Sequence, residues 1–509
     1  MKNKLLSEKR ISFYPYVIMF IVAIIVLLSS RLAPFANKYV EADTSIFIYI
    51  AEQILNGKIL YKDLFDHKGP ILFLFNVIGL IIGRGNLTGI WFLELGLLFV
   101  TLTFIYKSMC LYFDRLIALV STLSCLILFS TFLEAGRGDI TEEYVLPFIS
   151  VSMYYFLLFL KKHSMKNWHV AIIAFCCSCT FLVKPNMIII WMVGYLFVFI
   201  FLLKKLEYKK ILSIAMISIA VFLGVCTPFV IYFIYTNAWD DFIFTFWKFN
   251  MAYSDFSFSG FIVRVCKRLW FEPVGRTPFQ VFLFLFFMGV IINYKRLQYK
   301  TETWFFLLSI ILTILMISIS GYIFAHYYLL FVPIFSFPLA VVYDYIKKNF
   351  IGNPKLIYGF FFVLLLCGVI NDTKAAFEIQ PYKKSSSIEQ LISYIKNNTA
   401  ETDKIADVGM DCWVYILSGR ESVSKYAHQF PLVYVKQYGK KIAEDYMKDV
   451  KAGKPRIIIV RVPEGGLEYL PGFKEMLNAE YEDVVINDEL ISWGLHCWKR
   501  TQPKNKENG

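Results

Sequence analysis

Long apolar runs recur along the whole 509-residue chain, and they restrict it to a helical fold embedded in a membrane. The runs are roughly 16 to 26 residues long, and about 20 apolar residues are enough for an α-helix to cross the hydrocarbon core of a bilayer. The chain is also 57% hydrophobic, with a mean hydropathy of +0.56, which exceeds what soluble domains usually show. We therefore predict a polytopic α-helical membrane protein.

Lys and Arg clusters in the short segments between runs predict the orientation of the chain, because such clusters mark cytoplasmic loops. The N-terminus is then cytoplasmic, and the first run remains as an uncleaved helix, since no Ala-x-Ala site closes it. We expect about 11 to 13 crossings in all, and an odd number places the C-terminus outside. The crossings that can be placed are 16–32, 87–106, 116–134, 144–160, 170–184, 187–203, 211–236, 278–293, 302–320, 328–344 and 356–371.

One apolar segment does not fit this count. Residues 70–83 are apolar but too few for an easy crossing. If they crossed, most later basic loops would lie on the wrong side, so we interpret them as a re-entrant or shallow helix. The alternative is a true crossing with a further one nearby.

The composition changes after residue 371, which predicts three regions. Residues 1–371 form the transmembrane module, with a first external loop at 33–69, and 372–499 form an extracytoplasmic α/β domain. Residues 500–509 are polar and are expected to be disordered. Within the α/β domain we expect helices at 385–398 and 440–451, a helix or strand at 413–417, strands at 404–408 and 456–462, and a hairpin of 481–486 with 490–498.

Charge and cysteine content argue against nucleic-acid binding and against a zinc site. The net charge of +13 comes from short loops and not from a soluble basic face, so nucleic-acid binding is not indicated. Cys176, Cys177 and Cys179 lie inside an apolar run, where cysteine behaves as a small hydrophobe. Cys412 and Cys497 could pair in the α/β domain, although the sequence alone does not decide it.

The first external loop carries the densest set of polar residues. Asp43 is either a solvated charge or a functional acid. Lys68 precedes Gly69-Pro70, and proline suits the first position of a helix. A lysine at a helix N-terminus, where free N–H groups favour anions, can clamp a phosphate; the alternative is a lysine that only anchors the helix at the interface.

Other charged positions are assigned to the same face. Asp139 precedes the next helix, whereas Glu142 and Glu143 occupy its first turn, where the helix dipole alone favours acids. Lys184 stands at a break between two helices, and charges near a membrane at such breaks are functional candidates. His326 and Tyr327 lie at the start of another helix, where they could belong either to a functional site or to an aromatic belt at the membrane interface.

These residue types suit group transfer from a lipid phosphate. A carboxylate can act as general base on an acceptor hydroxyl, and lysines can neutralise charge that develops on a departing phosphate. The sequence contains no Walker loop and no His-Glu-x-x-His motif. It also lacks a cytoplasmic soluble domain for a nucleotide-sugar donor.

The ordered set resembles the C superfamily of multispanning glycosyltransferases, in particular family 39-like protein O-mannosyltransferases and lipid A aminoarabinose transferases. The resemblance covers residues 10–370, and the α/β domain is similar to the periplasmic domain that many members carry. The motifs that carry it are Asp43, Tyr61-x-Asp63-x-x-Asp66-His67-Lys68-x-Pro70, Gly138-Asp139, Lys184-Pro185 and His326-Tyr327-Tyr328.

The resemblance implies an inverting enzyme of the bacterial inner membrane that uses a polyprenyl-phosphate sugar. It assigns catalysis to Asp43 and Asp139 and donor-phosphate binding to Lys68, Lys184, His326 and Tyr327. Candidates for lining the substrate pocket are Glu41, Tyr61, Asp66, His67 and Arg137.

Two departures leave the metal requirement open. Thr44 follows Asp43 where relatives often have a second acid, and Gly69 replaces a common proline. No cofactor is certain, but a divalent metal is possible, with His326 joined by Asp43 or His67. The acceptor is a lipid, glycan or protein.

Two competing functions remain at this stage. A flippase or transporter of lipid-linked sugars predicts charges inside the helices, which are almost free of them apart from Glu94. A non-catalytic scaffold for envelope assembly predicts that Asp43 and Lys68 can be replaced without loss of function. Arg264, Lys267 and Arg268 in the 237–277 loop suit either an anionic acceptor or lipid headgroups.

Overall fold

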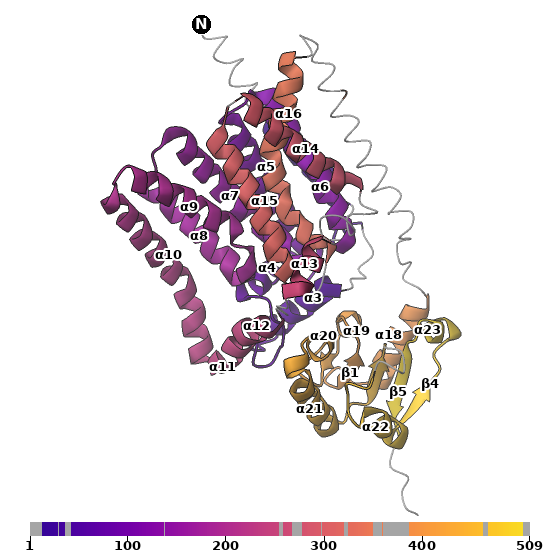
Figure 1. The fold of residues 1–509 in the computed structure, drawn as a ribbon. Coiled ribbons are helices and arrows are strands. Elements are labelled where there is room, and N and C mark those ends of the chain that lie inside the picture. Colours follow the sequence, from indigo (N-terminus) through magenta and orange to yellow (C-terminus); the bar gives the residue numbers. More distant parts are fainter. Residues whose placement is uncertain are drawn as a thin grey trace, which may run out of the picture. The chain divides into compact units, whose positions relative to one another are not determined.

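The computed structural model of the chain separates into two compact units (Figure 1). It describes residues 13–28, 30–35, 42–136, 138–253, 258–266, 277–296, 298–319, 324–349, 359, 386–461 and 467–501. The helical unit consists of residues 1–36, 69–231 and 254–380, and the mixed unit consists of residues 37–68, 232–253 and 381–509. The chain therefore enters the mixed unit in three separate stretches.

The helical unit is built from apolar helices (Figure 1). Inside it, α5 packs against α7, and α14 packs against α16. Its helices are α2 (Tyr14–Leu27), α4 (Pro70–Ile82), α5 (Thr88–Cys110), α6 (Arg115–Gly136), α7 (Thr141–Lys162), α8 (Asn167–Val183), η1 (Pro185–Met187), α9 (Ile189–Lys204), α10 (Tyr208–Tyr235, grouped with the mixed unit from Tyr232 on), α13 (Phe258–Cys266), α14 (Thr277–Arg296), α15 (Lys300–Ile319), η4 (Ala325–Leu330) and α16 (Phe331–Asn349).

The prediction of a polytopic helical membrane protein is confirmed. In the described part of the chain, six helical segments are long and apolar enough to cross a membrane: 88–110, 141–162, 208–235, 279–296, 300–319 and 326–349. Five shorter apolar helices accompany them, and one of these is α4. A helix as short as α4 extends about 20 Å, less than the hydrocarbon core, so its crossing stays an open question. The crossing predicted at 356–371 lies outside the described residues, apart from Gly359.

Close helix packing in the helical unit depends on small residues. Gly289 of α14 lies against the backbone of Pro338 in α16, where a Cβ would come within 2.6 Å of the Pro338 carbonyl oxygen. Gly224 of α10, by contrast, has no atom within 4 Å of its Cβ position. The glycine therefore sets the approach of α14 to α16, as small residues do between helices in membranes.

The mixed unit combines two short stretches from the first half of the chain with the C-terminal domain. The short stretches form α3 (Ala42–Leu55), α11 (Trp239–Phe242), the π-helix η2 (Ile243–Phe249) and α12 (Asn250–Tyr253). The C-terminal stretch forms α18 (Ser386–Asn398), β1 (Lys404–Val408), α19 (Trp413–Ser418), β2 (Glu421–Ser422), α20 (Phe430–Tyr434), α21 (Lys436–Gly453), β3 (Ile457–Val460), α22 (Phe473–Glu480), β4 (Tyr481–Val484), α23 (Asp488–Ser492) and β5 (His496–Arg500).

The described strands form one mixed sheet in the order β2-β1-β3-β5-β4. β1 runs parallel to β2 and β3, whereas β5 is antiparallel to both β3 and β4. Ile457, Ile458 and Ile459 of β3 are completely buried, as are Ile405 and Val408 of β1. Strands buried on both faces appear in sequence as continuous apolar runs, which is why β3 was recognisable.

The structure adds detail to the sequence expectations and corrects one of them, the hairpin. The stretch assigned to the first external loop contains a helix, α3, and the stretch 237–277 is largely helical where it is described. The second arm of the predicted hairpin begins as the short helix α23, and only 496–500 form a strand. Cys412 and Cys497 are buried free thiols, so the possible disulfide is not formed.

We expect Gly289→Ala to destabilise the protein by about 1 to 3 kcal/mol, because its methyl group would force α14 away from α16. Gly224→Ala is the matched control and should be neutral or stabilising, since alanine favours helix without a clash. Thermal unfolding of both variants in the same detergent measures the difference. Equal midpoints would show that the α14–α16 contact is not tightly packed.

Candidate functional site

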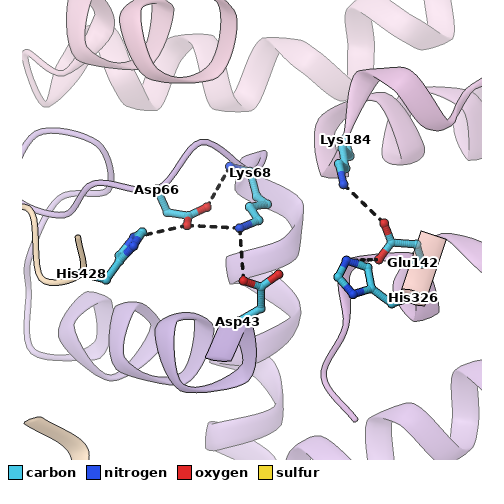
Figure 2. A network of polar contacts seen from close by, with 7 residues as sticks. All are labelled: Asp43, Asp66, Lys68, Glu142, Lys184, His326 and His428. Carbon is cyan, nitrogen blue, oxygen red and sulfur yellow. Dashed lines mark hydrogen bonds and ion pairs between the residues drawn. The ribbon is translucent and has the colours of Figure 1, made fainter. Parts of the chain in front are cut away.

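A buried lysine in the mixed unit lies between two carboxylates (Figure 2). Lys68 Nζ is 3.5 Å from Asp66 Oδ2 and 3.8 Å from Asp43 Oδ1. The Asp66 side chain is fully buried and that of Lys68 is 7% exposed, whereas that of Asp43 is 38% exposed. Asp43 is thus the member of this group that solvent or a substrate can reach.

Helix α3 fixes the position of Asp43. The aspartate lies in the first turn, where the helix dipole stabilises a negative charge. Farther along α3, Ser45 Oγ accepts a hydrogen bond from the Cys412 backbone amide at 2.9 Å, and Tyr49 OH accepts one from the Ser422 amide at 2.9 Å. The C-terminal domain therefore holds the helix that carries the acid.

A tight turn positions Lys68. Tyr61 adopts a left-handed backbone conformation with φ of 69°, and its hydroxyl donates to the Lys68 carbonyl oxygen at 2.8 Å. The Tyr61 ring is fully buried against Phe233 and Phe242. The Lys68 amide also donates to Asp66 Oδ1 at 2.9 Å, so both the backbone and the side chain of Lys68 contact Asp66.

His428 completes this group, and the sequence did not reveal it. Its Nε2 lies 3.6 Å from Asp66 Oδ2, and the side chain is almost fully buried (Figure 2). Burial lowers the pKa of His428 to about 4, since desolvation and the Lys68 charge outweigh the attraction of Asp66 and Asp43. The imidazole is therefore neutral at physiological pH and contacts Asp66 without adding a charge.

The structure buries His67 among aromatic rings. Its ring stacks on Phe430 at 5.6 Å and lies near Phe249 and Tyr253. Asn250 Nδ2 donates to the His67 carbonyl oxygen at 2.7 Å. Like Tyr61, His67 supports the turn around Lys68, and its contact with a substrate stays a prediction.

A second charged group lies inside the helical unit. Glu142 Oε1 is 3.3 Å from Lys184 Nζ, and Glu142 Oε2 is 3.8 Å from His326 Nε2 (Figure 2). Lys184 Nζ also lies 4.3 Å from the centroid of the Tyr327 ring, a cation–π contact. Three of the four residues predicted to bind phosphate are thus brought together, and Glu142 contacts two of them, Lys184 and His326.

Asp139 lies beside this helical-unit group in sequence but has its own partners. Its Oδ1 accepts hydrogen bonds from Asn76 Nδ2 at 2.9 Å and from Tyr144 OH, and its amide donates to Glu94. Asp139 is fully buried and has a left-handed φ of 53°. Its surroundings hold the carboxylate in one orientation, and its role in catalysis stays a prediction.

Several residues of both groups were missed or undervalued. Asn76 had a signal, because it is a lone amide in the apolar helix α4. Glu142 was attributed to the helix dipole alone, and only the fold reveals its contacts with Lys184 and His326. His428 had no local signal. The predicted candidates Glu41 and Arg137 lie outside the described residues.

The donor set does not fit a metal ion. Among the described residues, no three His, Cys, Asp or Glu side chains converge on one point. Between Asp43 and Asp66, the place that a divalent cation would take is filled by the Lys68 ammonium. The possible divalent metal is therefore not supported by these residues.

The shifted pKa of His428 predicts an acid-sensitive fold. The unfolded state binds a proton near pH 6.5, whereas the folded state resists it until about pH 4. The contribution of His428 to stability is therefore complete above pH 6.5 and falls as the pH drops toward 4, by up to about 1.4 kcal/mol per pH unit. Thermal unfolding across this range measures it as the difference in slope between wild type and His428→Gln, and the variant should lose stability less steeply. His496→Gln, at a half-exposed site in the same unit, is the control. Identical slopes in wild type and His428→Gln would contradict the assignment.

Comparison with known proteins identifies the fold. No protein-family model and no curated protein matches the chain in sequence. The crystal structure of ArnT from Cupriavidus metallidurans bound to undecaprenyl phosphate is similar, with a TM-score of 0.64 and 13% identity over 96% of this chain and 99% of that one. The apo structure of the same protein gives a TM-score of 0.63 at 13% identity, over 97% of this chain and all of that one. The chain has the ArnT fold along nearly its whole length, which confirms the aminoarabinose transferase-like architecture expected from the sequence.

Proposed function

We propose that this protein is an inverting glycosyltransferase that moves a sugar from a polyprenyl-phosphate donor to a hydroxyl acceptor. The observation that carries the proposal is the group formed by Asp43, Asp66 and Lys68. It presents a partly exposed carboxylate next to a buried, oriented ammonium. General-base catalysis needs a carboxylate that substrate can reach, and phosphate departure needs a fixed positive charge.

Asp43 and Lys68 have separate roles in the proposed reaction. Asp43 takes the proton from the acceptor hydroxyl, and the oxygen attacks the anomeric carbon opposite the phosphate. The bond between the anomeric carbon and the phosphate oxygen breaks as the new glycosidic bond forms, and this inverts the configuration. The bonding electrons leave with the polyprenyl phosphate, whose charge Lys68 neutralises. Asp66 and neutral His428 hold Lys68 in place.

The proposed donor class rests on two supports. The similar ArnT structure was solved with undecaprenyl phosphate, a lipid phosphate of this class. In addition, the helical unit holds half-buried Lys184 and His326 against the buried Glu142, with the Tyr327 ring beside Lys184, and charged side chains within a membrane protein mark substrate sites. We assign Lys184, His326 and Tyr327 to the donor phosphate, with Glu142 as the residue that positions Lys184 and His326.

The proposed setting is the outer face of a bacterial inner membrane. The N-terminus would be cytoplasmic, and residues 372–499 would form an extracytoplasmic domain. The acceptor would be a lipid, a glycan or a protein. The catalytic assignment of Asp139 is kept as part of the proposal, in the role of an acid held by Asn76 and Tyr144.

Asp43→Asn should lower the rate of sugar transfer by about 10²- to 10⁴-fold, because the amide cannot accept the proton. The measurement is transfer of radiolabelled sugar from a panel of polyprenyl-phosphate sugars to envelope fractions, at matched protein levels. Glu52→Gln on the same helix is the control and should transfer at the wild-type rate. Unfolding midpoints of both variants establish that the fold is retained.

Other outcomes would redirect the proposal. Equal transfer by wild type and Asp43→Asn would remove Asp43 as the base. If neither transfers any sugar of the panel, the flippase and scaffold functions gain weight. Translocation of a lipid-linked sugar in vesicles then separates these two.

Lys184→Gln should raise the KM for the lipid-phosphate donor about tenfold or more, since an ammonium–phosphate hydrogen bond is among the stronger polar contacts. The same change should weaken inhibition by free polyprenyl phosphate. Lys205→Gln, at the exposed end of α9, is the matched control. An unchanged donor KM in Lys184→Gln would remove this lysine from the donor site.

A further inference from the structure

The mixed unit contains a polar pocket of about 470 Å³ that the proposed chemistry does not use. It is lined by α3, by the turn at 58–64, by β2 and the segment after it, and by α21. Five lysines and four acidic residues reach its wall, together with serine hydroxyls and two tyrosines. This volume lies within the range of small-molecule sites, but the wall is far more polar than that of a lipid or drug site.

Most of the lysines in the wall are already occupied. Lys58 Nζ lies 3.1 Å from Glu421, and Lys425 Nζ lies 3.0 Å from Asp241. Lys62 Nζ donates to the Thr236 carbonyl oxygen at 3.1 Å. These contacts neutralise or satisfy the ammonium groups, so the pocket is not a simple anion site.

The acids are occupied in a similar way, with one exception. Asp449 accepts a hydrogen bond from Ser424 Oγ at 2.6 Å, and Asp63 accepts one from the Ile59 amide at 2.8 Å. Asp445 and Lys448 lie one turn apart on exposed positions of α21, and neither has an ion pair with another described residue. One negative and one positive side chain are thus available to a ligand.

A buried amide also faces this pocket. Gln53 of α3 is only 6% exposed, yet its Oε1 has no hydrogen-bond partner among the described residues. A buried acceptor without a partner is costly, so such atoms usually mark a bound molecule or water. A ligand that brings an O–H or N–H group into the pocket would satisfy Gln53.

We propose that this pocket binds the sugar portion of a glycan acceptor. The inference rests on the proposed glycosyltransferase function and names its acceptor class. A hydroxyl both donates and accepts, so it matches a wall that contains carboxylates, ammonium groups and the Gln53 amide oxygen. The free charges cancel, which favours an uncharged, hydroxyl-rich ligand over a phosphate.

The test is saturation-transfer NMR with full-length protein in nanodiscs, using chitobiose, cellobiose and mannobiose as probes. Wild type should bind at least one disaccharide saturably. Asp445→Asn and Lys448→Ala should each weaken that affinity several-fold, and Gln53→Leu about tenfold. Glu444→Gln and Lys451→Ala, on exposed positions of α21 outside the pocket wall, should leave it unchanged. The α21 variants keep the test decisive even if Gln53→Leu destabilises α3.

The outcomes separate this inference from the proposed function. No saturable binding of any disaccharide by wild type overturns the inference, and so does binding that all variants retain. Binding of inorganic phosphate without binding of any disaccharide would make the pocket an anion site and would also overturn the inference. Disaccharide binding is measured without a donor, so it is detected whether or not the protein transfers sugar. Disaccharide binding therefore supports the acceptor pocket even if no sugar transfer is detected. Sugar transfer that the pocket variants leave unchanged would support the proposed enzyme but not the acceptor pocket.

Discussion

Buried charge is the constraint on which both polar groups of this protein depend. An ionised side chain out of water is stable only when an opposite charge or several polar groups accompany it. Lys68 meets this requirement with Asp66 and Asp43, and Lys184 meets it with Glu142. Each lysine is therefore fixed in direction before any substrate arrives. In the proposed reaction, a charge that is already oriented needs little rearrangement when the phosphate leaves.

The mixed unit holds helix α3, which carries Asp43, through contacts that are remote in sequence. Helix α3 is bound by the backbone amides of Cys412 and Ser422, hundreds of residues later in the chain. Asp66 likewise meets His428. The C-terminal domain thus acts as the support for the first loop, and not as a separate appendage. Changes in this domain, far from Asp43 in sequence, are expected to affect the chemistry of the first loop.

Local sequence patterns predicted the elements of the fold well but not its long-range contacts. Strand β1 was predicted with its observed bounds, and the helix breaks at Lys184 and His326 were placed correctly, because apolar periodicity and proline act locally. Helix α3 was missed because its polar first turn resembled a loop. His428 and Glu142 were missed as site residues because their importance comes only from partners brought in by the fold. The polar pocket could not be foreseen at all, since residues of the first loop and of the C-terminal domain, more than 300 positions apart, together form its wall.

The order of the sheet has a consequence for the behaviour of the protein at high density in a membrane. Its two edges are β2, which has only two residues, and β4, which carries Glu482 and Asp483. A short edge offers few free backbone groups, and an acidic edge repels a copy of itself. Neither edge of the sheet that the described strands form therefore favours the addition of a strand from a neighbouring molecule, which limits aggregation through this sheet.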